Sequence, residues 1–149
     1  IRDSTRLMAG KTDIVMMLNG ALAGLVAITA EPLTPSPLLA ILIGFVGALI
    51  MYFGTKFLES LQLDDVVGAI PVHMFAGIFG TLVVPASNPD TNFGTQFLGV
   101  ISVCVFSFVL SYIVFRTMKA TIGLRISKEA EKLGTDKAEV GVVAYSIRD

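Results

Sequence analysis

Four long apolar stretches dominate the sequence, and they restrict the chain to a fold that places them in a membrane. They cover approximately residues 13–30, 37–59, 65–84 and 93–119. An α-helix rises about 1.5 Å per residue, so a bilayer core about 30 Å thick is crossed by roughly 20 apolar residues. Each stretch is close to that length or longer. The sequence therefore predicts an all-α, polytopic membrane protein with four transmembrane helices.

The composition excludes several other classes of protein. Hydrophobic residues make up 54% of the chain and charged residues 15%, whereas intrinsic disorder requires low hydrophobicity and high charge. A net charge of −1 argues against a nucleic-acid partner. The single cysteine, Cys104, excludes an intrachain disulfide and a cysteine-based metal centre. The predicted spans hold no catalytic triad and no second histidine, so we expect no enzyme, no cofactor and no metal.

The Lys and Arg residues predict how the helices cross the membrane. With four spans, all eleven cationic residues fall on one side. They are Arg2, Arg6, Lys11, Lys56, Arg116, Lys119, Arg125, Lys128, Lys132, Lys137 and Arg148. The connections at residues 31–37 and 85–92 contain none. Because cytoplasmic segments carry the excess of Lys and Arg, we expect both ends of this chain in the cytoplasm.

This topology divides the chain into two parts. Residues 1–124 would form the transmembrane region of a cell-membrane protein, and residues 125–149 would form a cytosolic tail. The chain begins with Ile1 rather than Met, and we expect it to be a piece of a longer protein.

Small residues recur at helical spacing in the first three stretches and predict close helix packing. They are Gly20, Gly24 and Ala27, then Ala40, Gly44, Gly47 and Ala48, then Ala69, Ala76, Gly77 and Gly80. In a membrane, such residues let helix backbones approach one another. The fourth stretch is bulky almost all round, which favours a peripheral helix that faces lipid. The first three helices therefore resemble the interior of a larger bundle.

His73 is the only ionisable residue deep inside a predicted span. It lies eight positions after Asp65, about 12 Å along a helix and near the bilayer midplane. Ionisable groups at that depth usually face a cavity or a polar partner. One interpretation is a buried histidine that donates to a backbone carbonyl between helices. The other is a neutral pore histidine that offers one donor and one acceptor to a small polar molecule.

Other polar residues have simpler interpretations. Asp64 and Asp65 are expected at the start of the third helix, where acidic groups complement the helix dipole. Pro71 is expected to bend that helix. Asn19, in the first stretch, is expected to form a hydrogen bond that helps helices pack.

Four motifs, taken together and in order, resemble one known family. They are residues 18–29, residues 64–73 with 75–82, residues 121–127, and a spaced set in the tail: Glu129, Glu131, Gly134, Asp136, Gly141, Ala144 and Tyr145. These motifs resemble the eighth, tenth and eleventh helices and the tail of the ammonium transporters (Amt/MEP/Rh). The resemblance covers nearly the whole chain.

The resemblance implies an eleven-helix protomer built from two five-helix inverted repeats and assembled as a homotrimer, with one pore in each protomer. This chain would supply helices eight to eleven and the tail. His73 falls on the second of the family's two pore histidines, and Leu22 and Ala69 fall on pore-lining positions beside them. The implied function is ammonium or ammonia transport through a hydrophobic pore. Ammonium loses its proton there, ammonia crosses, and the proton travels separately.

The resemblance also assigns structural or regulatory roles to a further set of residues. They are Asp64, Asp65, Gly123, Arg125, Asp136, Gly141 and Tyr145. The tail would either pack under a neighbouring subunit and respond to a PII-type signalling protein, or form a loosely ordered solvated segment. A second possible function is an ammonium sensor of the same fold that signals through its tail, and a third is an unrelated inverted-repeat permease.

Three positions depart from the family pattern. Pro71 stands where Ser is common, Met74 where Gly is common, and Val140 where His is frequent. These differences indicate a divergent subfamily.

Overall fold

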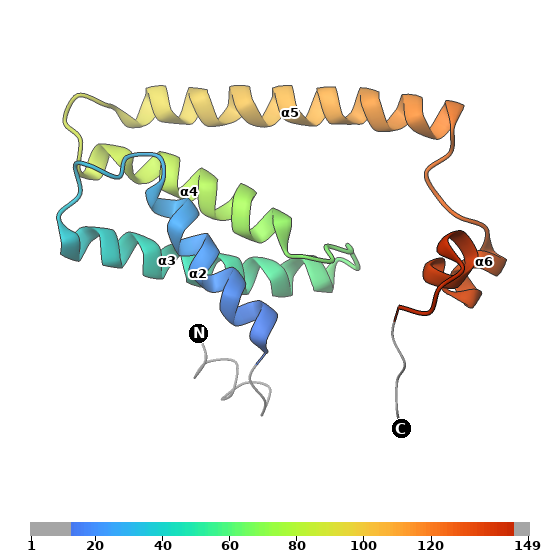
Figure 1. Cartoon of the computed structure of the whole chain (residues 1–149). Helices are drawn as coiled ribbons and strands as arrows, with labels where there is room; N and C mark the ends of the chain where they lie inside the picture. The colour runs from blue at the N-terminus through green and yellow to red at the C-terminus, as the bar shows by residue number, and fades with distance from the viewer. Residues whose placement is uncertain (1–12, 145–149) are drawn as a thin grey trace. The chain divides into compact units, whose positions relative to one another are not determined.

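The computed structural model describes residues 13–144, and all regular structure in that range is helical (Figure 1). In chain order the elements are α2 (Ile14–Ile28), α3 (Pro37–Ser60), the π-helical turn η1 (Ile70–Phe75), α4 (Ala76–Val83), the 3₁₀ turn η2 (Val84–Ala86), α5 (Phe93–Thr121), α6 (Lys128–Leu133) and the π-helical turn η3 (Asp136–Val140). The predicted all-α class is confirmed for the described residues. The chain divides after Cys104 into two compact units.

Local sequence explains where α2 and α3 begin. The carboxylate of Asp13 accepts a hydrogen bond from the Met16 amide at 3.0 Å, so it caps the free N–H groups of the first turn of α2. The hydroxyl of Ser36 does the same for Leu39 at 3.3 Å in α3. Pro37 opens α3, a position where its missing N–H and fixed φ fit the helix.

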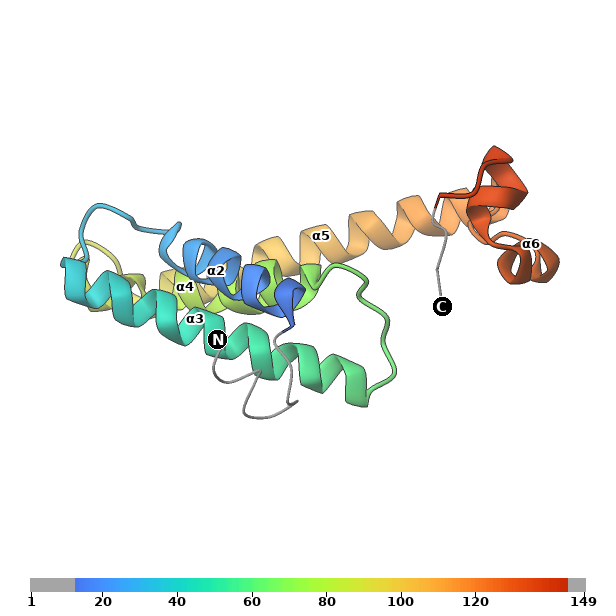
Figure 2. The same ribbon diagram turned by 60° about the horizontal axis from the view of Figure 1, so that its bottom comes forward.

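The first unit packs through small residues, as predicted. α2 crosses both α3 and α4 (Figures 1 and 2). Ala27 lies at both crossings: a Cβ on Gly47 of α3 would be 2.6 Å from the Ala27 Cβ, and a Cβ on Gly80 of α4 would be 2.9 Å from the Ala27 Cα. Gly24 likewise faces Gly44, where the added Cβ would be 3.1 Å from a carbonyl oxygen. The absence of side chains at these glycines is therefore what permits the close approach.

The third apolar stretch becomes helical later than predicted. Its helix was expected from Asp65, but regular helix begins at Ile70. Gly68 has a φ of +73°, a left-handed conformation that interrupts a right-handed helix and favours glycine. Pro71 then falls in the first turn, where proline is tolerated. His73 consequently lies in the first turn of the helix rather than two turns into it.

Two of the four predicted spans form helices that are long and apolar enough to cross a membrane, namely α3 and α5. α2 and the helical segment Ile70–Ala86 are apolar but shorter. α2, α3 and α5 begin and end within two residues of the predicted stretches. No residue of α5 is buried, which agrees with its bulky, unpatterned sequence. The described residues therefore fit a transmembrane protein.

Candidate functional site

The turn that carries His73 is fixed from one side by packing. Pro71 and Val72 are buried, and the Phe75 ring lies against Gly54 of α3, where an added Cβ would be 2.5 Å from the ring. In η1 the Ala76 amide donates to the Pro71 carbonyl, the i→i+5 bond of a π-helix. With these neighbours turned inward, His73 is exposed. No hydrogen bond joins its imidazole to another of residues 13–144.

The other two predicted pore residues are also on open surface. Ala69 is exposed and lies four positions before His73, at the base of the same turn. Leu22 is 48% exposed and belongs to α2, which packs against η1. The structure therefore brings Ala69 and His73 onto one turn, with Leu22 on the neighbouring helix.

The start of this turn is organised by Asp65 and Asn19. The Asp65 carboxylate accepts hydrogen bonds from the Ala69 amide at 2.9 Å and the Ile70 amide at 2.8 Å, so it caps the helix although it lies outside it. The Asn19 side-chain amide donates to the Val67 carbonyl at 2.9 Å. Asn19 thus forms a hydrogen bond as expected, but its partner is a loop carbonyl 48 residues away rather than a group on a neighbouring helix.

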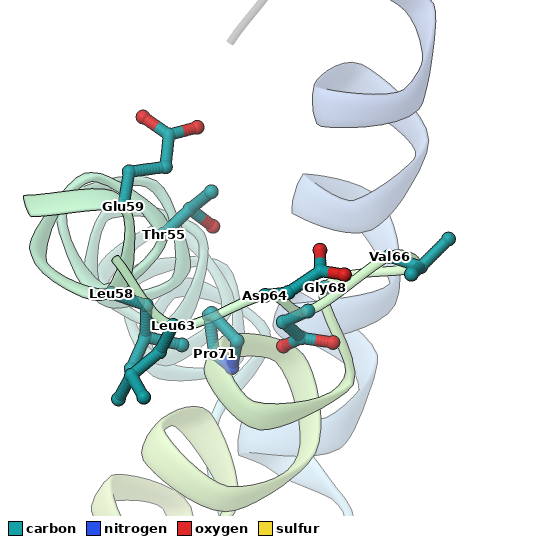
Figure 3. A pocket seen from close by; sticks show the side chains of 9 residues that line it. Thr55, Leu58, Glu59, Leu63, Asp64, Val66, Gly68 and Pro71 are labelled. Carbon is teal, nitrogen blue, oxygen red and sulfur yellow. The ribbon is translucent and has the colours of Figure 1, made fainter. Parts of the chain in front are cut away.

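A hollow of about 260 Å³ lies between the end of α3 and the segment before η1 (Figure 3). It is lined by Thr55, Leu58, Glu59, Leu63, Asp64, Asp65, Val66, Gly68 and Pro71. Two of its carboxylates have partners, since Glu59 pairs with Lys56 at 2.9 Å and Asp65 caps the helix. Asp64 is exposed at its edge. None of the three predicted pore residues lines this hollow.

In the second unit, Gly123 and Arg125 lead from α5 to α6. Gly123 has a φ of +79°, and its amide donates to the Met118 carbonyl at 3.0 Å, which satisfies a carbonyl at the helix end. Arg125 forms an exposed ion pair with Glu131 of α6 at 2.7 Å. Ser127 caps α6 by accepting from the Ala130 amide at 3.1 Å. These contacts set a fixed turn after α5.

Asp136 and Gly141 are brought together at the end of the described tail. The Gly141 amide donates to the Asp136 carbonyl, and Gly141 has a φ of +75°. The Asp136 carboxylate accepts from the Ala144 amide at 3.0 Å. This bond, with a second from the Lys137 amide, lowers the pKa of Asp136 below its ordinary value. Tyr145, the last predicted tail residue, lies outside the described residues.

Comparison with known proteins gives one consistent result. The chain matches the sequence model of the Ammonium Transporter Family over residues 3–145. It is 37% identical over 162 residues to ammonium transporter Amt2 of Archaeoglobus fulgidus, covering 95% of this chain and 34% of the relative. It is 33% identical over 147 residues to Amt2 of Methanocaldococcus jannaschii, covering 93% and 35%. It is 32% identical over 152 residues to ammonium transporter 1 of Dictyostelium discoideum, covering 91% and 33%.

These relatives are named as transporters rather than enzymes. The chain spans about a third of their length.

Proposed function

Because this chain belongs to the ammonium transporter family, we propose that it forms part of a pathway for ammonium or ammonia across a lipid bilayer. The observation that carries the proposal is the exposure of His73, with the apolar side chains of Ile70 and Met74 exposed on the same turn. Leu22, on the neighbouring helix, is exposed as well. An imidazole among apolar residues is costly beside lipid, whereas it suits a pore that other helices complete.

The proposed pore needs more helices than this chain provides. We place residues 1–124 as the last four membrane helices of an eleven-helix protomer with two inverted repeats. The remaining helices would cover His73, Ala69 and Leu22, each of which is exposed in this chain. The length of the relatives, about three times that of this chain, supports this arrangement.

Inside that pore, His73 would act on the proton of ammonium. A neutral imidazole accepts a proton or hydrogen bond at one nitrogen and donates at the other. Ammonium that gives up its proton becomes ammonia, which crosses apolar surroundings at a much lower cost than an ion does. Leu22 and Ala69 would supply the apolar walls, and the proton would travel by a separate route.

The tail would act outside the bilayer. With the Lys and Arg residues on the cytoplasmic side, residues 125–149 form a cytosolic segment of a cell-membrane protein. We propose that the protein is a homotrimer and that this segment packs under a neighbouring subunit, where a PII-type signalling protein regulates it. The fixed turn at Asp136 and Gly141 gives the segment a defined shape for such a contact.

Uptake by the full-length protein in proteoliposomes tests the role of His73. His73→Ala is expected to lower the rate of labelled methylammonium uptake by about a hundredfold, since a positioned proton-transfer group typically contributes that much. His73→Gln, which keeps a donor and an acceptor but cannot titrate, should remain equally slow. The matched control is Thr81→Ala, because among residues 13–144 the Thr81 hydroxyl bonds only to Gly77 of its own helix, at 2.9 Å.

Unchanged saturable uptake in His73→Ala would overturn the pore role. An ammonium sensor of the same fold predicts a different pattern: the unmodified protein would bind ammonium saturably yet give no flux above that of empty liposomes. Binding and flux measured on one preparation therefore separate the two functions.

A further inference from the structure

Asn19 links α2 to the segment that leads into the His73 turn. Its Nδ2 donates to the Val67 carbonyl at 2.9 Å. The same amide touches the next residue, because a Cβ on Gly68 would lie only 2.5 Å from Nδ2. Gly68 is buried there. One side chain of α2 therefore fixes two consecutive backbone units that precede the helix.

This fixed point connects directly to the first turn of the helix. The Gly68 carbonyl accepts from the Val72 amide at 3.2 Å, one residue before His73. On the other side, Asp65 holds the Ala69 and Ile70 amides. Asp65 thus holds the start of the 65–72 backbone through two hydrogen bonds. Asn19 links the same backbone to α2 through the Val67 carbonyl.

The direction of the His73 side chain depends on that backbone. The imidazole has no hydrogen-bond partner among residues 13–144, so within this part of the chain no polar contact sets its direction. A helix that begins one residue earlier or later turns every following side chain by about 100°. We propose that Asn19 is a positioning residue for His73, acting through Val67 and Gly68. The proposal rests on the pore role proposed above for His73.

Amide hydrogen exchange on the full-length protein tests the link itself, independently of transport. Asn19→Ala removes the donor and leaves the Val67 carbonyl unpaired. We expect exchange of the hydrogen-bonded amides of Gly68, Ala69, Ile70 and Val72 to accelerate about fivefold, as the loss of one hydrogen bond predicts. Thr29→Ala is the matched control, since Thr29 lies at the other end of α2 and bonds to Leu25 at 2.6 Å. It should leave residues 66–72 unchanged.

A double-mutant cycle on methylammonium uptake tests whether Asn19 acts through His73. Asn19→Ala alone is expected to lower uptake by about tenfold, because small displacements of a reacting group are costly. In a His73→Ala background the same substitution should change uptake by less than about twofold, as coupled residues are not additive. Asn19→Gln, which keeps the amide donor, should restore part of the loss. If Asn19→Ala yields too little folded protein, Asn19→Asp has the same shape and lacks the donor.

The outcomes separate this inference from the function on which it rests. Unchanged uptake in His73→Ala would remove the pore role, whereas accelerated exchange in Asn19→Ala would still establish the link to residues 66–72. If Asn19→Ala lowered uptake in the His73→Ala background as much as it does alone, the positioning role of Asn19 would be overturned. The pore role of His73 would remain intact. Equal effects of Asn19→Ala and Thr29→Ala on exchange or uptake would also overturn it.

Discussion

Gly80 of α4 packs directly on the backbone of Ala27 in α2, with no room for a side chain between them. A Cβ on Gly80 would overlap the Ala27 carbonyl oxygen and lie 2.9 Å from the Cα. Backbone cannot move aside as a flexible side chain can, so this contact fixes the distance between the two helices. Because α4 continues directly from η1, it also fixes how the His73 turn lies against α2.

Gly80→Ala is therefore expected to destabilise the protein, although alanine favours helix. Overpacking of this kind costs about 1–3 kcal/mol, against a helix-propensity gain of about 1 kcal/mol. Gly77→Ala, in the same helix, is the control, since its Cβ would meet only a Val26 methyl group at 3.7 Å. Thermal unfolding of the full-length protein in detergent should show a loss for Gly80→Ala and none for Gly77→Ala. Equal unfolding midpoints for the two variants would contradict the packing of Gly80 on the Ala27 backbone.

Gly68→Ala should be more harmful than its backbone conformation alone explains. A left-handed φ costs a residue with a Cβ about 1–2 kcal/mol. At Gly68 the Cβ also strikes the Asn19 amide, whereas at Gly123, with a φ of +79°, nothing lies within 4 Å. Gly123→Ala thus measures the conformational cost by itself. In the same unfolding experiment, the excess loss at Gly68 reports the contact with Asn19, and matching losses would rule that contact out.

Asp65→Ala is expected to destabilise the start of the helix by about 1–2 kcal/mol, the usual range for a lost cap. Asp65→Asn keeps one acceptor oxygen and should lose less. Asp64→Ala is the matched control at the neighbouring position, because Asp64 is exposed and caps no amide of residues 13–144. Exchange rates of the Ala69 and Ile70 amides should rise most in Asp65→Ala, less in Asp65→Asn, and not at all in Asp64→Ala. If Asp64→Ala raised the exchange rates of these two amides as much as Asp65→Ala does, the capping role of Asp65 would be overturned.

The sequence predicts the helices whose ends depend on local signals. α3 begins at a Ser-Pro pair that caps and opens a helix, and its predicted and observed starts coincide at Pro37. The third stretch is also apolar, yet its helix begins at Ile70 rather than Asp65. The difference arises at Gly68, whose conformation is supported by a contact from Asn19. A contact across 48 residues is not visible in a local pattern.

In the candidate site, too, some features could be predicted from the sequence, while others depend on contacts between distant residues. Residue type and position predict a helix start near Asp65 and a hydrogen bond from Asn19. The structure places the helix start at Ile70, with Asp65 capping it from outside, and gives Asn19 a partner in a loop. Which face His73 occupies depends on the burial of Pro71 and Val72 and on the Phe75 ring against Gly54. These are tertiary contacts, so the exposure of His73 in this chain could not be read from the spacing of its neighbours.

The order of the tail should depend on pH through Asp136. Its carboxylate accepts the Ala144 amide, which lowers its pKa in the folded tail below the ordinary value of 3.8. A group with a lowered folded pKa stabilises the fold above its unfolded pKa and loses that contribution as the pH falls through the folded pKa. Protection of the Ala144 amide, corrected for intrinsic exchange, should therefore be constant near neutral pH and fall below about pH 4. Asp136→Asn cannot ionise and should show weaker protection with no such fall. A matching fall in Asp136→Asn would assign the transition to another carboxylate, of which Glu131, paired with Arg125 at 2.7 Å, is the next to test.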